Sequence, residues 1–84
     1  MEAGTVASIP LSALLPGEAG TIVRVGLVGP ERRALLDLGF VPGTVVERIF
    51  QSPLGDPTAF RLRSTVVALR RSQAEAIEVQ RCKS

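Results

Sequence analysis

The stretch Arg33-Ala34-Leu35-Leu36-Asp37-Leu38-Gly39-Phe40-Val41-Pro42-Gly43-Thr44 decides the fold, because it combines a helix end, a turn and the start of a strand. Ala34, Leu35 and Leu38 recur at helical spacing and predict one apolar stripe. The helix is expected to begin at Pro30, since the first helical position does not need the N–H that proline lacks. The segment therefore predicts one short amphipathic helix.

The residues after this helix predict a sharp change of direction. Gly39 is expected to end the helix in a left-handed conformation, because glycine has no β-carbon to oppose a positive φ. Val41-Pro42-Gly43 has proline and glycine in the two central places that a type II turn prefers. A strand is expected to follow from Thr44 to Phe50.

The rest of the chain predicts short strands and helical turns. Alternation is clear where Phe60 and Leu62 point one way and Arg61 and Arg63 the other, which is typical of a half-buried strand. Ser64-Thr65 is expected to turn the chain into the next strand. The remaining expected elements are strands at 20–25, 66–69 and 77–79, a helical turn that Ser12 caps through Leu15, and a short helix with a Ser72–Glu75 capping box.

These elements together predict a mostly β fold, a small SH3-like barrel of about five strands with an inserted α-helix and short helical turns. We expect a flexible N-terminus at 1–8, one domain at 9–80 and a C-terminal tail at 81–84. The 84 residues include no stretch of the roughly 18 apolar residues that a membrane span needs. No secretory signal is recognisable, so a cytoplasmic location is expected.

The inventory of reactive side chains argues against an enzyme. The sequence contains no histidine, which is the commonest general base and transition-metal ligand, and its one thiol, Cys82, lies two residues from the C-terminus. Asp37 is expected on an exposed helix face, and Asp56 is expected to bond the backbone of its own turn. We therefore expect no catalytic residue, no cofactor site and no metal site.

Two groups of side chains leave alternatives open. Arg61, Arg63, Arg70 and Arg71 could contact phosphates, yet the net charge is only +2 and no aromatic residue lies among them to stack a base, so a solvated, charge-paired face is favoured. Separately, some apolar residues lie off the helix stripe or in turns. Either they belong to the core or they anchor a partner, and the three concerned are Leu36, Phe40 and Leu54.

Four segments of the chain resemble the FeoA family, which is associated with the bacterial ferrous-iron transporter FeoB. The segments are Leu14–Glu18, Leu35–Thr44, Ser52–Pro57 and Arg61–Arg71. The resemblance implies an SH3-like barrel whose helix lies beside a groove for protein contact. Two positions depart from the family pattern: Arg48 replaces an apolar strand residue, and Ser64 replaces a common hairpin glycine.

The resemblance implies a non-enzymatic accessory protein of ferrous iron transport that binds the cytoplasmic side of FeoB and can associate with itself. Two alternatives are a small basic barrel that binds nucleic acid, which is the less favoured partner, and an interaction domain like that of DtxR-type repressors. No direct insertion into a membrane is expected. The residues expected to bind the partner are Leu36, Leu38, Gly39, Phe40, Pro42 and Leu54.

The lack of histidine leads to a first prediction about metal ions. Without imidazole ligands, and with a single thiol, the chain should have no tight stoichiometric site for Fe²⁺ or Zn²⁺ at neutral pH. Calorimetric titration of the monomeric Cys82→Ser variant should show only weak association with carboxylates. A one-to-one complex of micromolar affinity would contradict this expectation.

Overall fold

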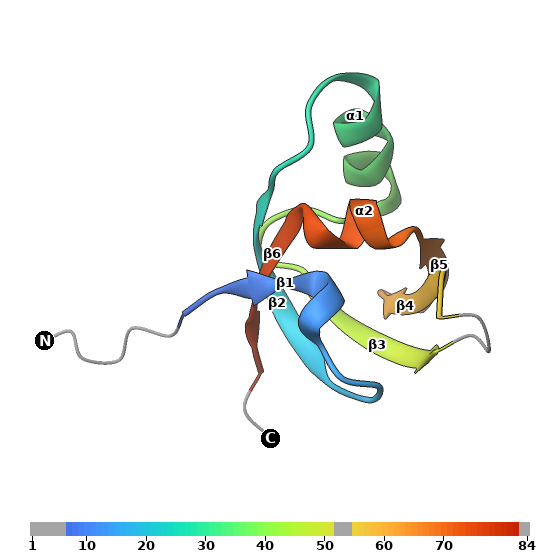
Figure 1. Cartoon of the computed structure of the whole chain (residues 1–84). Coiled ribbons are helices and arrows are strands. Elements are labelled where there is room, and N and C mark those ends of the chain that lie inside the picture. Colours follow the sequence, from blue (N-terminus) through green and yellow to red (C-terminus); the bar gives the residue numbers. More distant parts are fainter. Residues whose placement is uncertain (1–6, 52–54, 83–84) are drawn as a thin grey trace, which may run out of the picture.

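The computed structural model describes residues 7–51 and 55–82, which form six strands and three helices (Figure 1). The strands are β1 (Ile9–Pro10), β2 (Ala19–Val25), β3 (Val45–Gln51), β4 (Thr58–Leu62), β5 (Thr65–Leu69) and β6 (Ile77–Arg81). The helices are the 3₁₀ helix η1 (Leu11–Ala13), α1 (Gly29–Leu38) and α2 (Arg71–Glu75).

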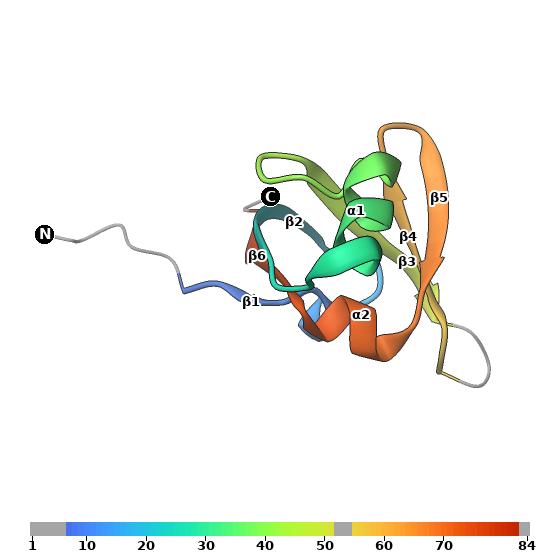
Figure 2. The ribbon, with the colours of Figure 1, turned by 90° about the horizontal axis from the view of Figure 1, so that it is seen from above.

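The six strands form one antiparallel sheet in the order β1-β6-β2-β3-β4-β5. The sheet curves around a common core (Figure 2), and the register shifts in β2 and β3 are the kind of irregularity that bends a strand. Five strands were expected, and β1 is the additional one. It has only two residues, one of them Pro10, so it leaves no strand pattern in the sequence.

The core is built from aliphatic side chains around two phenylalanines, Phe40 and Phe60, both with no exposed surface. The fully buried strand residues alternate with exposed ones, as the pattern of β4 shows with Phe60 and Leu62 inside and Arg61 outside. The other buried hydrophobic residues are Leu11, Leu14, Ile22, Val25, Leu35, Val46, Leu69, Ala74, Ile77 and Val79.

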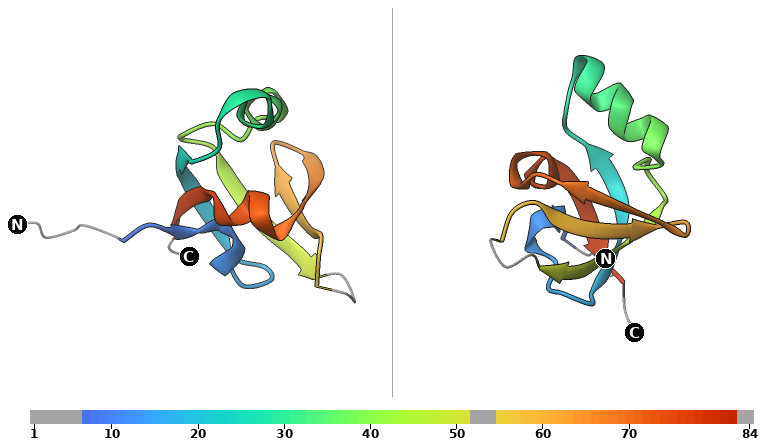
Figure 3. Two further views of the ribbon diagram at one scale, coloured as in Figure 1. Left: turned by 45° about the horizontal axis from the view of Figure 1, so that its top comes forward. Right: turned by 90° about the vertical axis from the view of Figure 1, so that its right-hand side faces the viewer.

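The predicted helix and its glycine stop are confirmed within one residue. Gly39 has φ +112°, and its N–H donates to the carbonyl oxygens of Leu35 and Leu36. Of the predicted apolar stripe, however, only Leu35 is buried. Ala34 and Leu38 are exposed, because α1 stands off the barrel (Figure 3) and packs on the core through Leu35 and Leu36.

The turn after α1 has the predicted type II form. The N–H of Thr44 donates to the carbonyl of Val41 at 3.1 Å, and Gly43 has φ +95°. The turn is tied to β2 by two backbone hydrogen bonds, from Gly43 to Ile22 at 2.8 Å and from Ile22 to Thr44 at 2.9 Å. It therefore fixes how the chain leaves α1 and enters β3.

The hairpin between β4 and β5 turns one residue earlier than expected. Its two loop residues are Arg63 and Ser64, with φ +51° and +74°, while Thr65 already pairs with Leu62. Two successive positive φ values are the signature of a type I′ turn, which matches the twist of the flanking strands. The position of the turn could not be predicted from the sequence, because neither residue is the glycine or asparagine that usually marks a type I′ turn.

The start of α2 differs from the predicted capping box. The helix begins at Arg71, and Gln73 Oε1 accepts a hydrogen bond from the N–H of Arg70 at 3.0 Å. Asp56 Oδ1 accepts one from the N–H of Arg71 at 2.9 Å. Asp56 thus supports the helix start across 15 residues, and within the described part of its own turn it accepts no backbone hydrogen bond. Ser12 likewise forms no cap, since η1 begins at Leu11 without a side-chain cap bond.

The unexpected Arg48 in β3 joins two parts of the barrel. Its side chain is half-buried, and its Nη1 donates to the carbonyl oxygens of Leu14 and Ser12, the latter at 3.4 Å. These carbonyls lie in and just after the short 3₁₀ helix η1, whose last carbonyls need donors. A charged donor therefore replaces apolar packing at this position of the strand.

Two glutamates, Glu18 and Glu78, form hydrogen bonds between parts of the chain that are distant in sequence. Glu18 accepts hydrogen bonds from the N–H of Leu15 at 2.8 Å and from Arg81 Nε at 3.1 Å. These donors stabilise the charged carboxylate, the Leu15 N–H most strongly, and lower the pKa of Glu18 below its usual 4.5. Arg24 and then Ser8 lower the pKa of Glu78 in the same way.

The geometry at Gly39 predicts a strong effect of Gly39→Val. A β-carbon there would lie 3.2 Å from Leu62 Cδ1, and the valine would have to adopt a positive φ. The free energy of unfolding should therefore fall by about 2–4 kcal/mol. Gly17→Val is the matched control, since Gly17 has φ +87° with nothing within 4 Å and should lose only about 1–2 kcal/mol. Urea unfolding of both variants gives the comparison, and equal losses would show that the contact with Leu62 is unimportant.

The two glutamates predict a loss of stability in acid. A pKa lowered in the folded state means that the unfolded chain binds protons first as the pH falls. The free energy of unfolding should therefore hold above about pH 5 and fall progressively below it. In Glu18→Gln/Glu78→Gln this fall should be shallower, as measured by urea unfolding at a series of pH values. An identical slope in both proteins would show that the two carboxylates do not control acid stability.

Candidate partner-binding surface

The helix α1 forms the most separate part of the structure and lies at one end of the barrel (Figures 1 and 3). Two points fix its direction. At its N-terminal end, Glu31 Oε2 lies 3.5 Å from Gln73 Nε2 of α2, and at its C-terminal end Gly39 lies against Leu62 of β4. The helix α2 follows the end of β5, and Leu62 pairs with the first residue of β5. The two ends of α1 therefore lie near the two ends of β5, and α1 runs alongside the β4–β5 hairpin.

The helix is anchored through few side chains. Leu35 is buried and Leu36 is half-buried against the core, whereas Leu38 keeps 48% of its surface exposed. Leu38 shares a helix flank with Glu31, seven residues earlier, so this flank faces the hairpin and α2. An apolar side chain therefore lies uncovered on the side of α1 toward β5.

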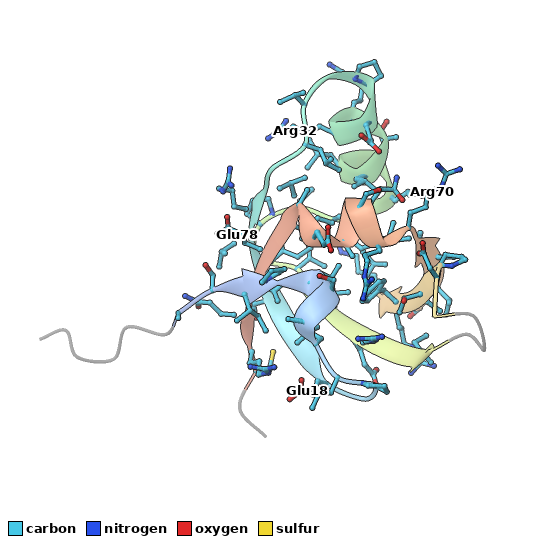
Figure 4. All side chains as sticks on the ribbon, in the orientation of Figure 1. Glu18, Arg32, Arg70 and Glu78 are labelled. Atoms are coloured by element: carbon cyan, nitrogen blue, oxygen red, sulfur yellow. The ribbon has the colours of Figure 1, made fainter. Side chains whose placement is uncertain are left out.

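The other flank of α1 bears a shallow hollow of about 610 Å³. Two pairs of its lining residues are spaced by one helical turn, Arg32 with Leu36 and Arg33 with Asp37. Figure 4 shows one of them, Arg32, projecting at the end of the molecule opposite Glu18. The residues that line the hollow are Gly29, Pro30, Arg32, Arg33, Leu36 and Asp37. Of these only Leu36 was among the expected partner residues, although the spacing of Arg32 and Arg33 to Leu36 and Asp37 indicates one face.

Of the predicted patch of Leu36, Phe40 and Leu54, the structure removes Phe40. Phe40 has no exposed surface and packs inside the barrel, because the left-handed Gly39 turns the chain inward directly after α1. Pro42 is exposed in the following turn, and Gly39 is half-buried. Leu54 lies outside the described residues. The expected contact residues that remain accessible are thus those of α1 and its turn, Leu36, Leu38, Gly39 and Pro42.

The arginines of the hairpin are only partly paired. Arg61 lies 3.4 Å from Glu47, and Arg71 lies 3.9 Å from Glu75 in the next helical turn. These pairs are exposed and stabilise the fold little. Arg63 and Arg70 form no ion pair with any described residue. Two cations thus lie at opposite ends of β5.

The described residues gather no set of metal ligands. Among residues 7–51 and 55–82, no three side chains of the cysteine and carboxylate types come together as a metal site would need. Cys82 is exposed, with its Sγ 3.7 Å from Thr21 Oγ1. Within the same ranges, every helix is too short or too polar to span a bilayer.

Comparisons with known proteins agree with this architecture. The family model described as the FeoA domain matches residues 9–81. A Fe(2+) transport protein A/Fe(2+) transporter FeoB fusion protein of Porphyromonas gingivalis is 40% identical over 70 residues, which are 83% of this chain. The chain spans only 8% of that protein.

Solved structures give the same result. The FeoA protein from Chlorobium tepidum has a TM-score of 0.85 and 32% identity, covering 89% of this chain and 71% of that one. FeoA of Stenotrophomonas maltophilia complexed with zinc, described as a procaryotic SH3 domain protein, has a TM-score of 0.73 and 28% identity, covering 88% and 89%. The predicted SH3-like fold is confirmed, and the chain belongs to the FeoA family, whose members are involved in ferrous iron transport.

Proposed function

We propose that this protein is a non-enzymatic accessory factor of ferrous iron transport that binds the cytoplasmic side of a FeoB-type transporter. The observation that carries the proposal is the fusion protein of Porphyromonas gingivalis, in which a segment 40% identical to this chain is joined to FeoB. Fusion keeps two modules at a high effective concentration, which is useful when separate copies of the modules must meet. A cytoplasmic location follows from this proposed partner.

The proposed contact surface is α1 with the turn that follows it. The helix touches the barrel through few side chains, so its exposed residues can meet a partner without disturbing the core. Leu38 and Pro42 are exposed there, and both stand on backbone fixed by hydrogen bonds of the helix end and the type II turn. A preformed surface of this kind loses little entropy on binding.

The surface is better suited to a transient contact than to a permanent one. Its apolar side chains are few, and arginines and a carboxylate surround the hollow at Leu36. Obligate interfaces are larger and more hydrophobic, whereas regulatory contacts are small and carry polar rims. A factor that joins and leaves a transporter matches the second type.

The test is capture of the purified cytoplasmic domain of the FeoB-type transporter from the same organism. Leu38→Asp should weaken binding about tenfold or more, because it places a charge in the apolar contact, while leaving the melting temperature nearly unchanged. Leu15→Asp is the matched control. Leu15 is 60% exposed, and its N–H bonds Glu18, at the end of the barrel opposite α1 (Figure 4).

The outcomes separate the surface from the partner. If Leu38→Asp and Leu15→Asp both bind as strongly as the unchanged protein, the contact lies elsewhere on the molecule. If the unchanged protein fails to bind the transporter domain in calorimetry, the proposed function is wrong. Loss of binding in both variants would indicate a general effect of added negative charge.

A further inference from the structure

The two edges of the sheet are protected very differently. The β1 edge is two residues long and includes Pro10, which has no N–H to offer. The β5 edge has five residues, Thr65-Val66-Val67-Ala68-Leu69, with no proline, no charged side chain and no register shift against β4. Proteins usually prevent pairing at such an edge with proline, charged residues or bulges. An edge without these features either promotes aggregation or receives another strand.

The register of the hairpin shows which backbone groups are open. The type I′ turn makes Leu62 and Thr65 a hydrogen-bonded pair, and the pattern alternates from there along the antiparallel ladder. Val66 and Ala68 therefore fall at non-hydrogen-bonded positions, and their N–H and C=O groups point away from β4. Neither residue forms another backbone hydrogen bond within the described part of the chain.

The surroundings favour an added strand of a particular chemistry. The right-hand view of Figure 3 shows β5 on the side of the hairpin toward α1. The flank of α1 that carries the exposed Leu38 faces this edge and offers apolar cover. Arg63 at one end of β5 and Arg70 at the other have no acidic partner among the described residues. The uncharged edge is thus bounded by two cations that have no ion pair within residues 7–51 and 55–82.

We propose that β5 receives an extended segment of a partner protein as an additional strand, with acidic residues at both ends of an uncharged centre. Its backbone would pair with the N–H and C=O groups of Val66 and Ala68, and its carboxylates would meet Arg63 and Arg70. This proposal deepens the proposed function, since the partner there is the transporter, but its test does not depend on that identity.

A second copy of the chain is a poor occupant of the same edge. Antiparallel pairing of two β5 strands, with Val66 against Ala68 of the other copy, would bring Arg63 of the turn before β5 near Arg71, the first residue of α2, of the other copy. Like charges that come close at the ends of two strands oppose their pairing, whereas carboxylates near these arginines favour it. The charges at the two ends of β5 therefore select a foreign acidic segment over self-association.

The first experiment uses two synthetic nine-residue probes, EETVTVTEE and KKTVTVTKK, titrated into the ¹⁵N-labelled protein. The acidic peptide should shift the amide signals of Val66 and Ala68 in a saturable way and slow their hydrogen exchange. The lysine peptide should bind at least about fivefold more weakly, because it lacks both carboxylate contacts. No saturable shift at millimolar acidic peptide, or shifts elsewhere than at β5, would overturn the proposal.

Two variants test the contacts separately. Ala68→Pro removes one outward N–H and should weaken binding of the acidic peptide about tenfold. Ala68→Ser keeps this N–H, and its affinity for the acidic peptide should stay within about twofold of the unchanged protein. Arg63→Gln/Arg70→Gln should abolish the preference for the acidic peptide over the lysine one. If Ala68→Pro disturbs the amide signals of Phe60 and Val67, the substitution has changed the hairpin itself. The proposal is then tested by the double arginine variant alone.

The transporter domain distinguishes this inference from the proposed function. If the domain binds the unchanged protein and Ala68→Pro equally, and the acidic peptide does not bind, the strand-addition proposal fails and the proposed function stands. If the acidic peptide binds at β5 while the transporter domain does not bind, the edge is a docking site and the proposed function is wrong.

Discussion

The structure depends on a single backbone constraint, the left-handed conformation of Gly39. Its φ of +112° ends α1 and turns the chain inward, so that the next residue, Phe40, reaches the centre of the core. The type II turn then follows, and its hydrogen bonds to Ile22 connect the end of the helix to the second strand. A β-carbon at Gly39 would both strain the backbone and press on Leu62, so no other residue serves both purposes equally well.

This constraint also leaves α1 available for binding. Because Phe40 supplies the large core side chain at this end of the barrel, the helix needs only Leu35 and part of Leu36 to hold its place. Its other large apolar side chain, Leu38, remains exposed and faces the hairpin. A helix packed more fully on the barrel would be more stable and would offer less to a partner.

The two edges of the sheet show how a small barrel can prevent strand pairing on one side and allow it on the other. Pro10 and the shortness of β1 close one edge, while the residues of β5 leave the other open between two arginines. The charges at the ends of β5 permit an acidic strand and oppose a second copy of the same strand. Under the strand-addition proposal, the chemistry of this edge forms a binding site without any reactive side chain.

Features with a local physical cause could be predicted from the sequence alone. The glycine stop, the Pro42-Gly43 turn and the alternation of β4 each follow from the conformational limits of a few neighbouring residues. Features that depend on contacts between distant residues could not be predicted, since the sequence does not show which groups meet in space. Those decided by the tertiary structure are the burial of Phe40, the exposure of Ala34 and Leu38, the pairing of β1 with β6, and the hydrogen bond from Arg71 to Asp56.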